Sequence, residues 1–368
     1  MKGRRGSAVP FFLLNRPARG SRFHFKCPAV RRYIFTVGRL NNIQYLRGVA
    51  ALIVVVAHSI SSLMRAHGSV IHVRGQFGVD LFFVISGLVM YLVCRGKFGA
   101  PDAPADYLRK RIARIVPAYW FWTMVCVLLF ALTMRAPSIN DVLRSLGFVP
   151  YGGAVTPRPV LGVGWTLTFE AFFYVLAAAA LCFRQGLRLL IAALLVLPTL
   201  GVIAHPAAPV IAVWTSPRLL EFASGIGLGL VRDQIRFGAL LLPAAALAIV
   251  LALGTQFLFP ESTPLLVRLP LAVVVVGAAA LGTDDQGRGM FARAGAALGD
   301  ISYGVYLTHS IVLAALLRLS HSWWMFPIAV VTSVGAGLLS YRAIEQPMGK
   351  AVRRALTSRT PISVGAQA

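Results

Sequence analysis

The sequence has few acidic residues, few charges of either sign and few cysteines. Only 13% of its 368 residues are charged, and Asp and Glu together number 12 against 36 Lys and Arg. With 57% hydrophobic residues, such a chain is not an ordinary soluble globule. Its four cysteines show neither a disulfide framework nor the ligand spacing of a metal site, so no metal is expected.

Hydrophobic runs of membrane-spanning length recur from residue 48 to residue 344. Most are about 17 to 21 residues long, which at ~1.5 Å per residue is enough to cross a ~30 Å hydrocarbon core. We predict an all-α polytopic membrane protein, a bundle of about ten transmembrane helices, with spans near 48–64, 78–95, 117–134, 164–182, 189–204, 210–231, 237–257, 264–282, 299–318 and 325–344. The predicted domains are a basic cytoplasmic extension at 1–40, an integral membrane domain at 41–350 and a cytoplasmic tail at 351–368.

The excess of basic residues indicates how this bundle is oriented. In a soluble protein a net charge of +24 would point to nucleic acid, but here the basic residues gather on alternate connections between the spans. With the amino terminus inside, 26 of them lie on the inner side and at most eight on the outer side. The positive-inside rule therefore predicts that both termini are cytoplasmic, with membrane lipids and no nucleic acid as partners.

The first 46 residues hold ten basic residues and no acid, which is typical of a cytoplasmic tail. Their apolar stretch at 11–14 is too short for the core of a signal peptide. Two alternatives stay open. One is a mitochondrial presequence, which is also Arg-rich and acid-poor. The other is a translation start nearer Val37.

Ionisable side chains inside predicted spans are functional candidates, because a charge in lipid costs several kcal/mol unless it has a partner. Arg47 and His58 are eleven residues apart, so they share one face of a helix with ~16 Å of axial separation. An anion bound at Arg47, at the cytoplasmic mouth, could belong to a molecule whose far end reaches His58. The alternatives are an interfacial anchor for Arg47 and a packing role for His58.

Two acids and one hydroxyl are further candidates for the site. Glu170 and His58 each lie six residues below the outer end of their spans, so the carboxylate can pair with the imidazole and fix its tautomer. Asp80, near the start of its span, is a weaker candidate and could simply complement the helix dipole. Ser86, two turns deeper, is either a site residue or a small residue that lets helices approach.

Two arginines follow the second span on the inner side. Arg111 and Arg114 are three residues apart on one helical face, an arrangement that can grip a phosphate bidentately. The alternative is a cluster that sets the topology and contacts anionic lipid.

Three further polar features lie later in the chain. His309, in mid-membrane, is either a second site residue or a hydrogen-bonding link between helices. Glu221 is expected to pair with Arg218, and Glu345 with Arg342, because each pair is three residues apart on a helix.

Six motifs follow one another along the chain. They are Arg47-x10-His58, Gly78-Val79-Asp80-x-Phe82-Phe83-x-x-Ser86-Gly87, Arg111-x-x-Arg114-x-x-Pro117, Trp165-Thr166-Leu167-x-x-Glu170, Tyr306-Leu307-x-His309 and Tyr341-x-x-Ile344-Glu345-x-Pro347. In this order they resemble the acyltransferase 3 family of bacterial membrane O-acyltransferases, and most of all its exopolysaccharide-production branch. The resemblance covers about residues 40 to 350. Thr166 stands where many members have Ser, which keeps the hydroxyl.

The resemblance implies transfer of an acyl group, usually acetyl, from cytoplasmic acyl-CoA to a sugar hydroxyl of a cell-surface polysaccharide or its lipid-linked precursor. It implies a multi-pass protein of the bacterial inner membrane, with acetyl-CoA as donor substrate and no tightly bound cofactor. The residues that would bind the CoA phosphates are Arg47, Arg111 and Arg114. His58 would act as general base or as transient acyl carrier, with its ring oriented by Glu170 or Asp80. Further candidates for the site are Ser86, Trp165, Tyr306 and His309.

Two other classes of protein fit part of the pattern. A proton-coupled transporter would also bury histidines and carboxylates in its helices, but it has no need of a pair of arginines that grips CoA. A structural protein without chemistry would use every buried polar group to hold helices together. It predicts that replacing His58 affects stability more than any reaction.

Overall fold

The apolar runs fold into α-helices in the part of the chain that the structure describes. This computed structural model describes residues 41–357, with gaps at 70–72, 74, 134–135, 154–157, 233, 235–240, 259–263 and 282–288. The predicted basic extension at 1–40 and residues 358–368 of the predicted tail lie outside the described residues. All described residues belong to one unit of the chain, residues 39–368.

The elements follow one another as a series of helices, which confirms the predicted all-α class. They are α2 (Asn41–Ala66), α3 (Gln76–Cys94), α4 (Ala103–Thr133), α5 (Ile139–Leu146), the 3₁₀ turn η1 (Gly162–Gly164), α6 (Trp165–Leu181), α7 (Gly186–Ala204), α8 (Pro209–Trp214), α9 (Leu219–Val231), α10 (Leu241–Leu258), α11 (Leu265–Leu281), α12 (Met290–Leu316), α13 (Met325–Ser340), the π-helical turn η2 (Tyr341–Glu345) and α14 (Gln346–Thr357).

Six helical segments among the described residues are long and apolar enough to cross a membrane, judged by length and composition. They are Asn41–Ala66, Gln76–Cys94, Ala103–Thr133, Gly162–Leu181, Gly186–Ala204 and Met325–Leu356. The chain is therefore a multi-pass membrane protein, as predicted.

The predicted spans differ from the helices at four places. The helix predicted at 299–318 begins nine residues earlier, at Met290, and the one predicted at 325–344 is α13, followed by η2 and α14 as far as Thr357. The span predicted at 210–231 is two helices, α8 and α9, because Pro217 lies between them and disfavours a helical conformation for the residue before it. The span predicted at 117–134 belongs to a helix that begins at Ala103, with Pro117 inside it. The basic stretch before Pro117 is thus amphipathic helix: Tyr107 is buried while Arg109 is exposed.

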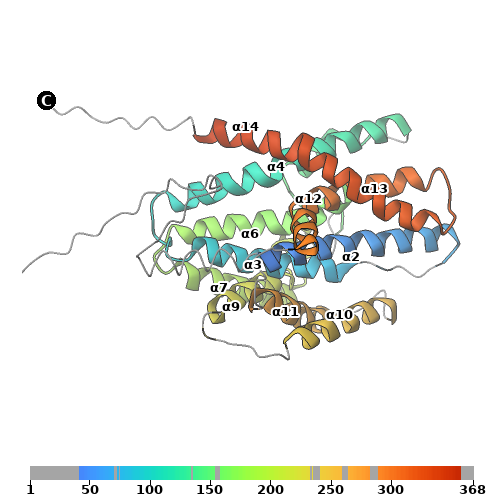
Figure 1. The fold of residues 1–368 in the computed structure, drawn as a ribbon. Coiled ribbons are helices and arrows are strands. Elements are labelled where there is room, and N and C mark those ends of the chain that lie inside the picture. The colour runs from blue at the N-terminus through green and yellow to red at the C-terminus, as the bar shows by residue number, and fades with distance from the viewer. Residues whose placement is uncertain are drawn as a thin grey trace, which may run out of the picture. The chain divides into compact units, whose positions relative to one another are not determined.

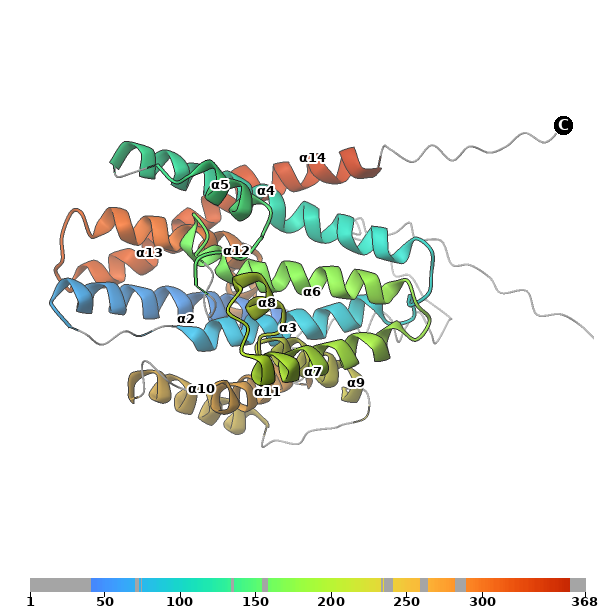
Figure 2. The same cartoon turned by 180° about the vertical axis from the view of Figure 1, so that it is seen from behind.

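Two pairs of helices that carry polar side chains are packed backbone to backbone, each at a glycine. Figures 1 and 2 show α3 running beside both α2 and α6. A side chain at Gly87 of α3 would collide with the backbone of α9 at Phe222, and one at Gly299 of α12 would collide with the backbone of α2 at Gln44. Glycine is required at both positions because the helix backbones meet there. The second contact holds α12 against the face of α2 that carries Arg47.

Candidate active site

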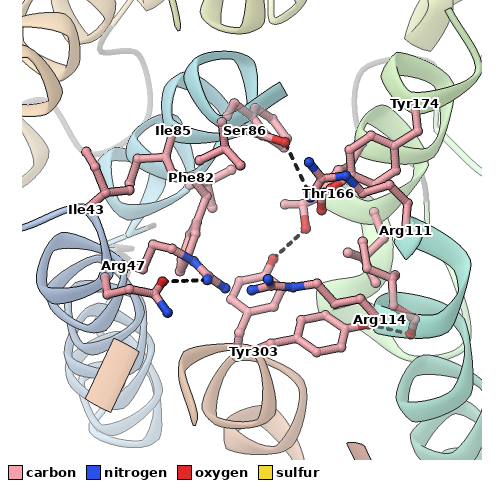
Figure 3. A pocket seen from close by; sticks show the side chains of 18 residues that line it. Ile43, Arg47, Phe82, Ile85, Ser86, Arg111, Arg114, Thr166, Tyr174 and Tyr303 are labelled. Atoms are coloured by element: carbon pink, nitrogen blue, oxygen red, sulfur yellow. Dashed lines mark hydrogen bonds between the residues drawn. The ribbon is translucent and has the colours of Figure 1, made fainter. Parts of the chain in front are cut away.

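A cavity of about 320 Å³ lies between α2, α3, α4, α6 and α12 (Figure 3). Its wall is mostly apolar, with residues such as Ile43, Val79 and Leu167. The polar residues that line it are Gln44, Arg47, Ser86, Arg111, Arg114, Thr166, Glu170, Tyr174, Tyr303 and Tyr306. The structure therefore brings together five of the predicted helical motifs around one space. An apolar cavity with a few convergent polar groups is the usual form of a small-molecule site.

Three arginines from two helices face this cavity. Arg47 of α2 and Arg114 of α4 point into the same space from opposite sides (Figure 3). Arg47 Nη1 donates to Gln44 Oε1 at 2.8 Å, and Gln44 Nε2 in turn donates to Asp300 Oδ1 at 3.0 Å. The guanidinium of Arg111 lies 5.2 Å from the ring centroid of Tyr174. The two helices predicted to supply a phosphate site thus contribute to a single cavity.

The charge of the cavity is strongly positive. Among the described residues, no carboxylate forms an ion pair with any of the three arginines, and Glu170 is the one acid in the cavity wall. Arg114 is exposed, whereas Arg47 and Arg111 are half-buried. The cavity therefore opens at a cationic end, which favours an anionic ligand such as a phosphate.

Glu170 is held by hydroxyl groups. Ser86 Oγ donates to Glu170 Oε1 at 3.2 Å, and the hydroxyl of Tyr174 donates to the same oxygen. The predicted pairing of Glu170 with His58 is wrong. The depth count placed the outer end of the span at Gly164, but the chain enters α6 inside the protein, where Val163 and Gly164 are buried. Glu170 therefore lies at the level of Ser86 and Arg111 instead of that of His58.

His58 has a histidine as its partner. Its Nδ1 lies 2.8 Å from Nε2 of His309, a fully buried residue of α12, and the two rings stack with centroids 5.1 Å apart. The structure thus joins two residues that the sequence singled out separately. Neither lines the cavity, but Tyr306, one turn before His309, does, and the two rings have centroids 5.8 Å apart.

Part of the cavity wall is a pair of aromatic rings. Phe82 and Tyr306 both line the cavity and meet edge to face, with centroids 6.1 Å apart. Phe82 also packs against a cluster of buried residues from α2 and α12, which are Ala51, Val55, Ile301 and Val305. The hydroxyl of Tyr306 donates to the carbonyl of Val163 at 2.9 Å and lies 2.9 Å from Thr166 Oγ1. Tyr306 therefore links the wall of the cavity to the histidine pair, because its ring lies beside that of His309.

Asp80 belongs to a separate, buried group of charges. Its carboxylate is fully buried and contacts Nη1 of Arg268 at 2.5 and 2.8 Å and Nη1 of Arg218 at 3.4 Å. Arg218 also pairs with Glu221 at 3.5 Å, as predicted, and lies 5.0 Å from the ring centroid of Trp165. The predicted role of Asp80 beside His58 is wrong, because two guanidinium groups hold its carboxylate between α9 and α11. Sequence reasoning missed Arg268, although this residue lies inside the span predicted at 264–282.

The predicted pair between Arg342 and Glu345 does not form. Both residues belong to η2, and in a π-helical turn two residues that are three positions apart do not lie on the same face. Glu345 Oε1 accepts instead from Ser340 Oγ at 3.4 Å. Sequence reasoning also missed Tyr174, although its position four residues after Glu170 was a usable signal.

Fold and site together define a polytopic membrane protein whose helices enclose a cationic cavity. Residues 40–342 match the family model described as “Acyltransferase domain”, that of acyltransferase 3. The chain belongs to this family, as its six motifs predicted, and is a membrane acyltransferase. Membership of an enzyme family decides against the transporter and structural alternatives.

Two relatives have informative names. The chain is 31% identical over 291 residues to “Exopolysaccharide production protein ExoZ” of Rhizobium meliloti (strain 1021), covering 74% of this chain and 89% of that protein. It is 25% identical over 353 residues to “Putative peptidoglycan O-acetyltransferase YrhL” of Bacillus subtilis (strain 168), covering 83% of this chain and 55% of that protein. The chain thus spans about half the length of the second relative. No solved structure gives a significant match.

Proposed function

We propose that this protein moves an acyl group, most simply acetyl, from cytoplasmic acyl-CoA to a sugar hydroxyl of an exopolysaccharide or another cell-surface glycan, or of its lipid-linked precursor. The observation that carries the proposal is the cavity whose three arginines lack an ion-pair partner among the described residues. The acceptor class is suggested by relatives named for exopolysaccharide production and peptidoglycan O-acetylation. Acyl-CoA acts as a substrate, and no tightly bound cofactor is needed.

The donor would bind at the cationic end of the cavity. Coenzyme A carries several phosphate charges, and guanidinium groups bind phosphate oxygens through charge-assisted, often bidentate, hydrogen bonds. Arg47, Arg111 and Arg114 surround the cavity on two sides, and the exposed side chain of Arg114 marks its opening. The apolar wall beyond them suits the uncharged pantetheine arm. The thioester would then point toward Tyr306 and the histidine pair behind it.

His58 would act as the general base. Its Nε2 takes the proton from the sugar hydroxyl while the hydroxyl oxygen attacks the thioester carbon, the C–S bond breaks, and the protonated imidazole returns the proton to the CoA thiolate. The products are an O-acyl ester and free CoA. A transient acyl carrier at the same nitrogen is the other route, and it differs by leaving label on the protein when no acceptor is present.

The orientation follows from the charges. With the basic connections inside, both termini are cytoplasmic and the arginine end of the cavity faces the compartment that holds acyl-CoA. We place the protein in the bacterial inner membrane on this basis. The acceptor would reach the histidine pair from the opposite side.

The experiment that tests the function is transfer of label from radioactive acetyl-CoA to polysaccharide or glycolipid in membranes that contain the protein. Label should enter the glycan as an ester that mild base releases, and His58→Ala should abolish transfer at equal expression. His67→Ala is the matched control, because His67 follows the same helix but packs against Trp323 outside the site. Equal transfer by His58→Ala would remove His58 from the reaction, and no transfer by any form would contradict the proposed function.

A further inference from the structure

The hydrogen bonds of His309 determine which of its nitrogens carries a proton. Its Nδ1 lies 2.7 Å from the carbonyl oxygen of Tyr306 and 3.3 Å from that of Val305. A carbonyl oxygen only accepts, so Nδ1 is the nitrogen that carries hydrogen. Because the side chain of His309 is fully buried, a cationic ring would be costly, and the neutral ring leaves Nε2 without hydrogen.

The hydrogen bond between the two rings then determines which nitrogen of His58 carries a proton. Nε2 of His309 lies 2.8 Å from Nδ1 of His58, and an unprotonated nitrogen at that distance is an acceptor. Nδ1 of His58 is therefore the donor and carries the hydrogen. In a neutral imidazole the remaining nitrogen, Nε2 of His58, then holds the lone pair. The order of donors runs from His58 through His309 to the backbone of α12.

The orientation of the His58 ring is fixed as well as its tautomer. The two rings stack with an interplanar angle of 27°, and α12 itself is held against α2 where Gly299 meets Gln44. His309 bonds its own helix through Nδ1, so it presents Nε2 at a defined point. Orientation and tautomer are the two properties that a histidine base requires of its partner.

We propose that His309 is a positioning residue, which holds His58 in the Nδ1–H tautomer so that its Nε2 lone pair serves acyl transfer. The inference rests on the proposed function for the use of that lone pair, but not for the tautomer itself. It gives a neutral histidine the position that an acid holds beside the histidine of a catalytic triad. The acid expected there, Glu170, is engaged with Ser86 and Tyr174 instead.

Two substitutions separate positioning from packing. His309→Gln places a carbonyl oxygen where Nε2 lies, so it keeps an acceptor for His58, whereas His309→Leu fills a similar volume without one. We expect His309→Leu to lower kcat for acetyl transfer on the order of 100-fold, with KM for acetyl-CoA unchanged because the arginines are intact. His309→Gln should recover most of that loss. An equal loss in both variants, or none in either, would overturn the proposal.

A spectroscopic measurement tests the tautomer without any reaction. The protein is labelled with ¹⁵N-histidine in proteoliposomes, and the signals of His58 and His309 are assigned among the seven histidines by comparison with His58→Gln and His309→Gln. We expect both rings to be neutral with hydrogen on Nδ1, and His58 to lose this preference in His309→Leu. Hydrogen on Nε2 of His58 in the unmodified protein would overturn the proposal.

The transfer assay and the ¹⁵N spectrum test the proposed function and the role of His309 separately. Absence of acetyl transfer by the unmodified protein, together with the expected ¹⁵N spectrum, would contradict the proposed function and leave the role of His309 toward His58 intact. Normal acetyl transfer together with the Nε2–H tautomer of His58 would support the proposed function and contradict the role of His309. Thermal unfolding of each variant in detergent checks that the leucine variant remains folded, and His67→Leu serves as the control for an ordinary histidine replacement.

Discussion

Two groups of charged residues lie close to each other in this protein and are built in opposite ways. Around the cavity, three arginines face one carboxylate, which is bound by two hydroxyls. Between α3, α9 and α11, two arginines face two carboxylates, and every one of these four contacts an opposite charge. The first group has positive charge left for a ligand, and the second has none.

The difference teaches how to tell a binding site from a structural group of charges within a membrane. A buried charge persists only with a partner, and a balanced set supplies all partners from the protein itself. An unbalanced set that lines a cavity leaves the partner to come from outside. In the sequence, Asp80 and Arg47 are equally good candidates for a functional site. Only the charges around them in the structure show that Asp80 belongs to the balanced group and Arg47 to the cavity.

The largest expected effect comes from breaking the balanced group. Asp80→Leu removes the carboxylate that pairs with both Arg268 and Arg218, and removing one partner of a buried pair costs about 3 to 5 kcal/mol of folding free energy. We expect a large fall in the thermal unfolding temperature of the detergent-solubilised protein.

A matched control is Asp106→Leu. Asp106 pairs with Lys110 at 2.7 Å, but both side chains are about half exposed, so its loss should cost less than ~1 kcal/mol. An Asp80→Leu protein of unchanged stability that no longer transfers acetyl would place this group in the reaction and remove the contrast between the two regions.

An intermediate effect is expected from reducing the charge of the cavity. Arg114→Gln removes a charge-assisted contact worth about 1.5 to 3 kcal/mol, so KM for acetyl-CoA should rise roughly tenfold to a hundredfold while kcat and stability change little. Arg109→Gln removes an exposed arginine of the same helix outside the cavity and should leave KM unchanged. If both variants raised KM equally, the general charge of α4 would explain binding and the cavity would not.

The sequence was sufficient for the fold class and for much of the site. Apolar runs of spanning length predict helices, because in lipid the backbone groups can form hydrogen bonds only within the helix. The prediction of helix is correct even on both sides of Pro217, which breaks one predicted span. The spacing of Arg111 and Arg114 placed both on one helical face. Such periodic signals are local, so one sequence is enough to read them.

The partners of the buried charges could not be predicted in the same way. Depth was counted from the ends of apolar runs, which fails where a loop enters the protein, as it does before Trp165. The contacts of His58 with His309 and of Asp80 with Arg268 join residues 251 and 188 positions apart. The periodicity of a sequence does not show which residues far apart in the chain are in contact, because those contacts depend on which helices pack together.

The smallest expected effect concerns Glu170, the carboxylate in the described part of the cavity wall, and it sharpens the contrast between the two regions. The hydroxyl of Tyr174 helps to hold Glu170, so that this acid does not neutralise Arg111, which lies against the Tyr174 ring. Tyr174→Phe keeps the ring and removes one hydrogen bond worth about 1 kcal/mol, which should raise KM for acetyl-CoA roughly fivefold as Glu170 turns toward the arginine. Tyr107→Phe, which also keeps a ring beside Arg111, should have no such effect. A lower KM in Tyr174→Phe would mean that Glu170 does not compete with the ligand, and that the positive charge of the cavity is kept available in another way.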